Sequence, residues 1–162
     1  PELFYAESFS HGTHEITKNI QANGRYGAVQ AEKTAQITID ADVYAVYTKG
    51  ADGQNAAMAV EAGGTSKVII KGGDFRQVGV CDLIYATDKA TIEIQGGTFK
   101  AVTPANTLNV IDSARGVAKI IVSGGSFYKY DPSHPAMGEN EVFVADGYHV
   151  EQNGDWYTVV KN

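Results

Sequence analysis

One nine-residue pattern occurs three times in this chain and constrains its fold more than any other feature of the sequence. The copies read KVIIKGGDF at residues 67–75, TIEIQGGTF at 91–99 and KIIVSGGSF at 119–127, and a looser copy, QITIDADVY, occupies residues 36–44. Similarity that recurs every few tens of residues is typical of a solenoid, in which each repeat buries its apolar face against the next. The pattern therefore predicts a stack of coils.

Each copy begins with residues that alternate between apolar and polar. In the second copy, Ile92 and Ile94 alternate with polar neighbours, which is the period of a β-strand with one buried face. Two glycines follow in the three close copies, and paired glycines in a strand pattern indicate a sharp bend or a close approach of two backbones. We expect such bends at six glycines: Gly72, Gly73, Gly96, Gly97, Gly124 and Gly125.

An aromatic residue ends every copy, two positions after the glycine pair. Successive coils of stacked strands are separated by about 4.8 Å, so equivalent rings are expected to form an internal column. In the looser copy Ala41-Asp42 takes the place of the glycines. The predicted core column is therefore Tyr44, Phe75, Phe99 and Phe127.

The spacing of the copies favours coils over propeller blades or helical repeats. Gly72 and Gly96 are 24 residues apart, and Gly96 and Gly124 are 28 apart, so the bends accommodate insertions while the strands stay constant. No long segment has helical periodicity with caps. A second apolar strand is expected in each coil, at residues 58–60, 83–86 and 108–111.

Over about residues 26–130 the chain resembles the right-handed parallel β-helix of the pectate-lyase-like superfamily. The expected fold is all-β: a short solenoid of about four coils, with an N-terminal arm and a C-terminal β-hairpin cap. That superfamily includes lyases, hydrolases, phage tailspikes and non-enzymatic surface proteins, so the resemblance does not assign an activity. An antiparallel sandwich of repeated hairpins is the alternative, although it leaves the recurrent Gly-Gly-x-Phe unexplained.

Composition excludes several classes of partner. The 162 residues suffice for one domain with a core, and the formal net charge of −6 with scattered basic residues opposes nucleic-acid binding. No stretch reaches the apolar length of a membrane span. The single cysteine, Cys81, cannot form an internal disulfide and is expected to be a small buried apolar residue.

Residues 1–25 do not match the repeat and are expected to form an N-terminal arm or a cap over the first coil. Terminal segments stay disordered unless something holds them in place, so the apolar and aromatic residues of this segment are expected to bind a partner. They are Leu3, Phe4, Tyr5 and Phe9.

The N-terminus also bears on localisation. No charged and apolar secretory leader is visible, and Pro1 is interpreted as a start exposed by removal of methionine, or as the start of a processed precursor. A native start favours a virion component made in the cytoplasm of an infected cell. The bacterial cell surface is the alternative location.

Residues 131–162 predict a compact β cap. Residues 141–144 are expected to form a short strand, and Asn153-Gly154 between strand-like residues is a strong hairpin signal. Trp156 or Tyr157 is expected to cover the last coil. The region resembles closing modules at the ends of β-helical proteins of gut bacteria and their phages.

A search for chemistry yields no catalytic centre. Lyases of the superfamily use clustered acids to bind calcium, but the outward column before the glycines is mixed: Asp40, Lys71, Gln95 and Ser123. Hydrolases on this fold use acidic pairs about 5–10 Å apart. Three carboxylates near bends are candidates for such a pair, but we interpret them as solvent-exposed bend residues: Asp82, Asp88 and Asp112.

The sequence offers one candidate for a metal site, near the N-terminus. His11 and His14 lie three residues apart beside Glu15, and such side chains bind metals, but no further ligand is nearby in the sequence. We expect no catalytic residue, no metal and no cofactor.

The expected function is that of a non-enzymatic structural protein of a tailed phage. It would be a capsid decoration (auxiliary) protein or a small head or tail appendage, and a homotrimer is expected. Its arm would pair with the major capsid protein or another virion protein. One alternative is a carbohydrate-binding or glycan-degrading module that uses exposed aromatics such as Tyr47, Tyr85 or Tyr128. The other is a fragment of a bacterial surface adhesin.

Overall fold

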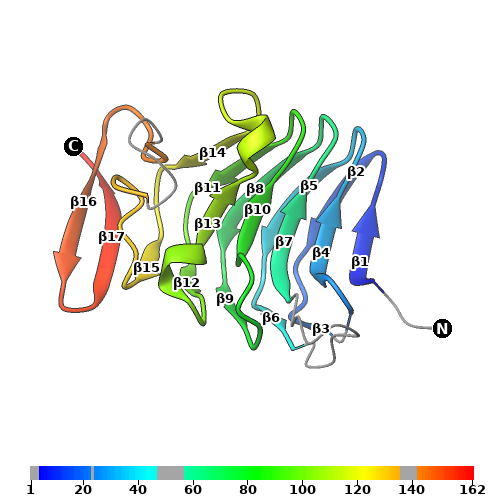
Figure 1. The fold of residues 1–162 in the computed structure, drawn as a ribbon, viewed down its shortest axis with the longest axis horizontal. Coiled ribbons are helices and arrows are strands. Elements are labelled where there is room, and N and C mark those ends of the chain that lie inside the picture. The colour runs from blue at the N-terminus through cyan, green and yellow to red at the C-terminus, as the bar shows by residue number, and fades with distance from the viewer. Residues whose placement is uncertain (1–3, 23, 47–56, 136–141) are drawn as a thin grey trace.

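The computed structural model describes residues 4–22, 24–46, 57–135 and 142–162. They form an all-β solenoid of about five turns that ends in an antiparallel hairpin (Figure 1). The predicted parallel solenoid with a hairpin cap is confirmed, with about five turns in place of four. The sandwich alternative is excluded because every coil-to-coil ladder is parallel.

Three parallel sheets make up the walls of the solenoid, and each turn contributes one strand to each sheet. Sheet A contains β1 (Tyr5–Phe9), β4 (Gly27–Ala31), β7 (Met58–Ala62), β10 (Ile84–Ala86) and β13 (Leu108–Val110). Sheet B contains β2 (Thr13–Ile16), β5 (Gln36–Asp40), β8 (Lys67–Gly72), β11 (Thr91–Ile94) and β14 (Lys119–Val122). Sheet C contains β3 (Ile20–Ala22), β6 (Val43–Ala45), β9 (Asp74–Gln77), β12 (Thr98–Lys100), β15 (Ser126–Tyr128), β17 (Trp156–Lys161) and β16 (Tyr148–Asn153).

Two short 3₁₀ turns, η1 (Pro104–Asn106) and η2 (Asp112–Ala114), lie in the connections of the last coils. None of the helical segments in the described ranges has the length and apolar character needed to cross a membrane.

The N-terminal segment forms the first coil. β1, β2 and β3 pair in parallel with β4, β5 and β6. Ile16 lies beside Ile39 and Ile20 beside Val43, so inward columns of side chains continue into this coil. The described part of residues 1–25 is thus a coil and not a separate arm or cap, which corrects the expectation. This coil lacks the Gly-Gly bend, so it did not resemble the repeat.

The paired glycines lie at the corner between sheets B and C, where successive coils approach closely. A Cβ atom at Gly96 would overlap the carbonyl oxygen of Lys71 in the preceding coil. Gly97 adopts a φ of +103°, which L side chains rarely adopt. The first glycine of the pair is therefore required by space and the second by backbone conformation.

Phe75, Phe99 and Phe127 form an internal column with one ring in each of three successive coils. All three are fully buried, and their ring centroids are 4.9 Å and 4.8 Å apart with interplanar angles of 12°. These spacings match the rise of about 4.8 Å between paired strands. The rings lie on the strands of sheet C, which the sequence did not predict because strands this short show no clear alternation.

Tyr44 lies outside this column, which corrects the prediction. Val43 pairs with Phe75 and is buried, whereas Tyr44 pairs with Arg76 and is 39% exposed. The cause is a register shift in the preceding ladder, where successive residues of β5 pair with β8 residues two positions apart. The looser copy is therefore one residue shorter at the bend, and counting along its sequence places the column one position too late.

Aliphatic columns fill the rest of the interior. On sheet B, the residues at one inward position of each coil pair from strand to strand and are buried: Ile16, Ile39, Ile70, Ile94 and Val122. On sheet A, small residues occupy the equivalent position in three successive coils: Ala31, Ala62 and Ala86. These positions are uniform because each side chain packs on the same type of side chain above and below it.

The C-terminal residues close the last coil. β17 pairs antiparallel with β15, which places Tyr157 beside Phe127, and β16 pairs with β17 through the two-residue turn Gly154-Asp155. The predicted hairpin is therefore confirmed. The strand expected at residues 141–144 is reduced to a single bridge between Val144 and Val122, and residue 141 lies outside the described residues.

The aromatic column predicts a large difference between two aromatic substitutions. We expect Phe99→Ala to lower the free energy of unfolding by about 3–5 kcal/mol, because it leaves a cavity between two stacked rings. Tyr44→Ala should cost less than about 1 kcal/mol, since its ring lies on the surface. Urea unfolding at equilibrium measures both changes. Similar losses for the two variants would contradict the assignment of Val43 to the column.

Candidate functional site

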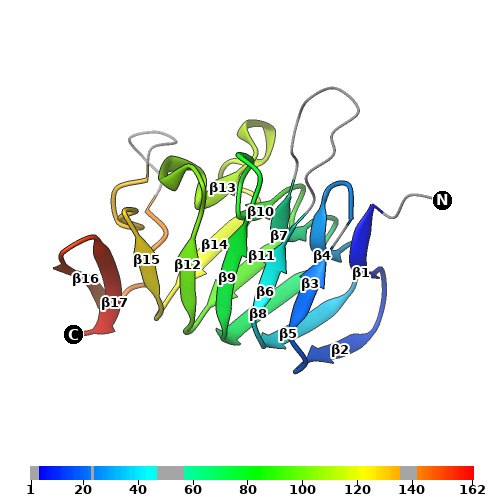
Figure 2. The ribbon, with the colours of Figure 1, turned by 90° about the horizontal axis from the view of Figure 1, so that it is seen from below.

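The two ends of the solenoid differ in how their strands are covered. At the N-terminal end, sheets A, B and C end on β1, β2 and β3, each of which has a neighbour on one side alone among the described residues (Figure 2). At the C-terminal end, the hairpin covers β15 and the segment around Val144 bridges to β14, while β13 is left as the last strand of sheet A. We call the exposed face of the first coil the open end.

Backbone groups of β2 point away from the solenoid at the open end. Gln36 N–H donates to the carbonyl oxygen of Gly12 at 2.8 Å, so the backbone groups of Gly12 point toward β5. Because backbone groups alternate in direction along a strand paired in parallel, Thr13 and Glu15 direct their N–H and C=O groups away from β5. Unpaired edges of this kind are sites for the addition of a further strand.

Apolar side chains of the interior reach the surface at the open end. A depression of about 490 Å³ is lined by Phe9, Ile16 and Ile20, with Glu7, Glu15 and Lys18 among the other residues around it. Phe9 also stacks on His14, with ring centroids 4.4 Å apart. The open end therefore combines unpaired backbone groups with an apolar centre and a charged rim.

Of the four predicted partner-binding residues, the three that the structure describes lie in different environments. Phe9 lines the open end, as described, and Leu3 lies outside the described residues. Phe4 is 54% exposed and stacks on Tyr26, with ring centroids 5.2 Å apart. Tyr26, which the sequence reasoning missed, makes this an exposed aromatic pair beside β1. The residues around Tyr26 in the sequence do not mark it as an interacting residue, because it meets Phe4 only when the first two coils pair.

Tyr5 fastens the first coil to the third. Its hydroxyl donates to the carboxylate of Glu61 on β7, across a β4 strand that has Gly27 opposite Tyr5. Burial raises the pKa of Glu61, and the neighbouring carboxylates of Glu32 and Asp88 raise it further, while the Tyr5 hydrogen bond lowers it. The Tyr5 pKa is raised mainly by burial and then by Glu61. This contact ties β1 to the body of the solenoid.

The three bend carboxylates each have a local partner. Asp82 accepts a hydrogen bond from Asn109 at 2.9 Å, and burial raises its pKa. Asp88 accepts from the Gly64 N–H at 2.8 Å, and Asp112 pairs with Arg115 at 2.8 Å.

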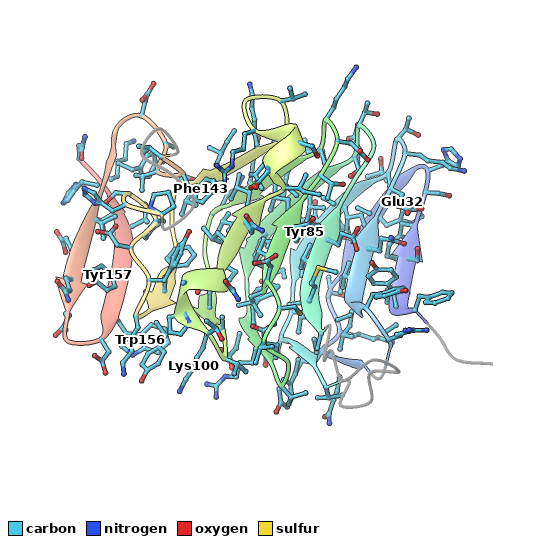
Figure 3. The ribbon with its side chains drawn as sticks, in the orientation of Figure 1. Glu32, Tyr85, Lys100, Phe143, Trp156 and Tyr157 are labelled. Atoms are coloured by element: carbon cyan, nitrogen blue, oxygen red, sulfur yellow. The ribbon has the colours of Figure 1, made fainter. Side chains whose placement is uncertain are left out.

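Two of these carboxylates, Asp82 and Asp112, also act on Tyr85, which lies on the outer face of sheet A (Figure 3). In register, Tyr85 lies between Glu61 and Asn109. Burial is the largest cause of the raised Tyr85 pKa, and the negative charges of Asp82, Glu61 and Asp112 raise it further. The face is acidic, and its Glu61 and Asp82 carboxylates accept hydrogen bonds from Tyr5 and Asn109. Glu61 is the member that the sequence reasoning did not single out.

The remaining candidate side chains make hydrogen bonds to neighbouring loop residues. His11 Nδ1 lies 3.0 Å from Thr34 Oγ1, and His14 Nε2 lies 2.7 Å from the His11 carbonyl oxygen. Across the described ranges, no group of three or more His, Cys, Asp or Glu side chains is arranged to hold a metal. Cys81 is half-buried, and its pKa is raised mainly by burial, which disfavours the reactive thiolate.

One local cluster was not anticipated from the sequence. Ser133 Oγ lies 2.6 Å from Asp131 Oδ1 and 2.9 Å from His134 Nδ1, and the same His134 nitrogen lies 3.2 Å from Asp131 Oδ2. One imidazole nitrogen thus faces both partners, whereas a serine nucleophile and an orienting acid use opposite nitrogens. We interpret the cluster as a turn held by Asp131.

Comparison with known proteins leaves this geometry without a relative: no protein-family model, no curated protein and no solved structure matches the chain.

The buried carboxylate of Glu61 predicts a pH dependence of stability. Its pKa is raised in the folded protein above the ordinary value of 4.5, so folding binds a proton, and the contribution to stability is lost as the pH rises through the raised value. Glu61→Gln keeps an acceptor for the Tyr5 hydroxyl and removes the charge. Below the ordinary pKa the stability difference between wild type and variant should be constant, and above it the variant should become progressively more stable relative to wild type.

Urea unfolding of both proteins from about pH 3 to about pH 8 measures this difference. The other titrating groups are shared, so the pH dependence of the difference comes from Glu61 and from the carboxylates coupled to it, Glu32 and Asp88. A difference that does not change with pH would contradict the raised pKa of Glu61.

Proposed function

We propose that this chain is a non-catalytic structural protein that attaches to a larger assembly through the open end of its solenoid. The asymmetry of the two ends carries the proposal: at one end a hairpin covers sheet C and a bridge covers sheet B, whereas at the other end all three sheets expose strand edges around an apolar centre. Exposed edges promote pairing with other chains. A solenoid whose strand edges are open at one end and mostly covered at the other end is suited to attachment through the open end.

The attachment would be by strand addition. A partner strand placed beside β2 would accept hydrogen bonds from the outward N–H groups of Thr13 and Glu15 and donate to their carbonyl oxygens. Its apolar side chains would cover Phe9, Ile16 and Ile20. Main-chain hydrogen bonds provide affinity in this mode, and side-chain pockets provide specificity. The Phe4–Tyr26 pair would extend the contact on the side of sheet A.

The assembly that we propose is the virion of a tailed phage, with the chain as a capsid decoration protein or a small head or tail appendage. The partner would be the major capsid protein or another virion protein, and a trimer would match threefold positions of an icosahedral shell. The stacked aromatic and aliphatic columns support this proposal, because a continuous core makes a stiff unit that can brace a shell. No reaction centre is needed for such a role.

A proline at the open edge tests this attachment. Glu15→Pro removes an N–H group that points away from β5, so the bonds within the protein are kept and the docking edge is blocked. We expect Glu15→Pro to be depleted at least tenfold from purified virions of the phage that encodes the chain, as measured by quantitative mass spectrometry.

Glu15→Ala is the matched control, because it removes the same side chain and keeps the N–H group; it should be incorporated at the wild-type level. Circular dichroism and urea unfolding of the free variants establish that both are folded. Absence of the wild-type chain from virions would overturn the phage assignment, and equal incorporation of the two variants would overturn attachment through β2.

A further inference from the structure

The outer face of sheet C carries a column of cationic and aromatic side chains toward the C-terminal end of the solenoid. The strands β6, β9, β12 and β15 lie side by side (Figure 2). Their register brings one outward residue of each into line, and Lys100 and Tyr128 directly follow the paired residues Phe99 and Phe127. In order along the solenoid these residues are Tyr44, Arg76, Lys100, Tyr128 and Trp156. Neighbouring members are separated by about 4.8 Å, the distance between paired strands.

Two ammonium groups lie over a single ring in this column. The Nζ atom of Lys100 is 4.4 Å from the ring centroid of Tyr128, and the Nζ atom of Lys129 is 5.3 Å from the same centroid. Neither lysine forms an ion pair with a carboxylate of the described residues, whereas Arg76 pairs with Asp74 at 2.7 Å. Two like charges held on one ring without a counter-charge form a site that favours an anion.

Rigid elements hold these side chains in place. Lys129 adopts a φ of +49°, and its N–H donates to the carbonyl oxygen of Asp155 in the hairpin turn at 2.6 Å. Trp156 packs edge-on against Tyr128, with ring centroids 5.4 Å apart. Figure 3 shows Lys100 and Trp156 along the same edge of the molecule, beneath β12 and β15. A ligand here would meet a preformed surface, which lowers the entropic cost of binding.

A second column of polar side chains runs beside the first. Thr98 Oγ1 donates to Asp74 Oδ1 at 2.8 Å, and the hydroxyls of Ser126 and Thr158 are 2.8 Å apart. These residues are two positions from the cationic and aromatic members on the same strands, so they share their face of the sheet. The surface thus combines hydroxyl groups, half-buried rings and two ammonium groups that have no carboxylate partner among the described residues.

We propose that this strip, defined by Lys100, Tyr128, Lys129 and Trp156 with the adjacent hydroxyls, binds an acidic glycan whose anionic groups are carboxylates or sulfates. The ammonium groups neutralise the anions, the exposed part of the Trp156 ring packs on the apolar face of a sugar, and the hydroxyls of Ser126 and Thr158 hydrogen-bond to ring substituents. The strip lies on a different surface from the open end, so the inference is independent of the proposed attachment.

Charge distinguishes a glycan from a nucleic acid. The chain has a formal net charge of −6, and a phosphate backbone requires an extended basic footprint. The strip provides two unpaired ammonium groups, which suits a polymer that carries an anionic group on some of its sugars. An acidic peptide would meet the same charges but has no need of the exposed ring, and the experiment separates the two.

Affinity electrophoresis and isothermal titration calorimetry with defined polymers test the inference. The probes are alginate for carboxylates, dextran sulfate for sulfates, unmodified dextran as the uncharged counterpart, and polyglutamate as an acidic peptide. We expect the wild-type chain to bind alginate or dextran sulfate and not dextran, with an affinity that decreases as salt increases.

The double variant Lys100→Gln with Lys129→Gln should weaken binding by about tenfold or more, since it removes two charge-assisted contacts. Lys89→Gln with Lys119→Gln is the matched control: both lysines are exposed and lie off the strip, and the change in net charge is the same. Trp156→Leu should weaken binding to the glycan and leave the charge of the strip intact.

Three results would overturn the inference. They are no binding to either charged glycan, equal losses for the two double variants, and polyglutamate binding as tight as that of the glycans with no effect of Trp156→Leu. The last would assign the strip to an acidic peptide.

Discussion

The close approach of successive coils at the corner between sheets B and C is the constraint on which the rest of this structure depends. Gly96 and Gly124 leave no space for a Cβ atom beside the carbonyl oxygens of Lys71 and Gln95. Because the backbones meet there, the phenylalanine after each corner falls into register with the one below it. Ring spacings of 4.8–4.9 Å follow, and the same register continues the aliphatic columns of sheets A and B.

Repetition explains which parts of the fold could be predicted from sequence. In each Gly-Gly-x-Phe copy the glycines permit the corner and the phenylalanine fills the core, so three coils and their core rings were recognisable. Asn153-Gly154 marked the hairpin. The first coil was missed because it lacks both the corner glycines and an aromatic residue after them, whereas the looser copy at residues 36–44 keeps the aromatic. Tyr44 was misplaced because its copy is one residue shorter at the corner, and a single-residue shift exchanges the inward and outward faces of a strand.

Surface function was less predictable, because it arises from residues that meet only after stacking. Tyr26 joins Phe4, Glu61 receives the Tyr5 hydroxyl, and Lys129 lies over Tyr128 beside a lysine from another coil. No spacing along the chain links these partners. The repeat therefore specifies the interior of the solenoid, and the side chains between the inward positions, together with the open end, are free to differ and to carry the interactions that we propose.

Hydrogen–deuterium exchange of the backbone amides, read by mass spectrometry in the free chain and in the assembled particle, tests the central claim most directly. The account predicts that peptides of β1, β2 and β3 exchange faster than those of the middle coils in the free chain and become protected in the assembly, while β16 and β17 are unchanged. Protection that appears at the hairpin and not at the first coil would contradict attachment through the open end.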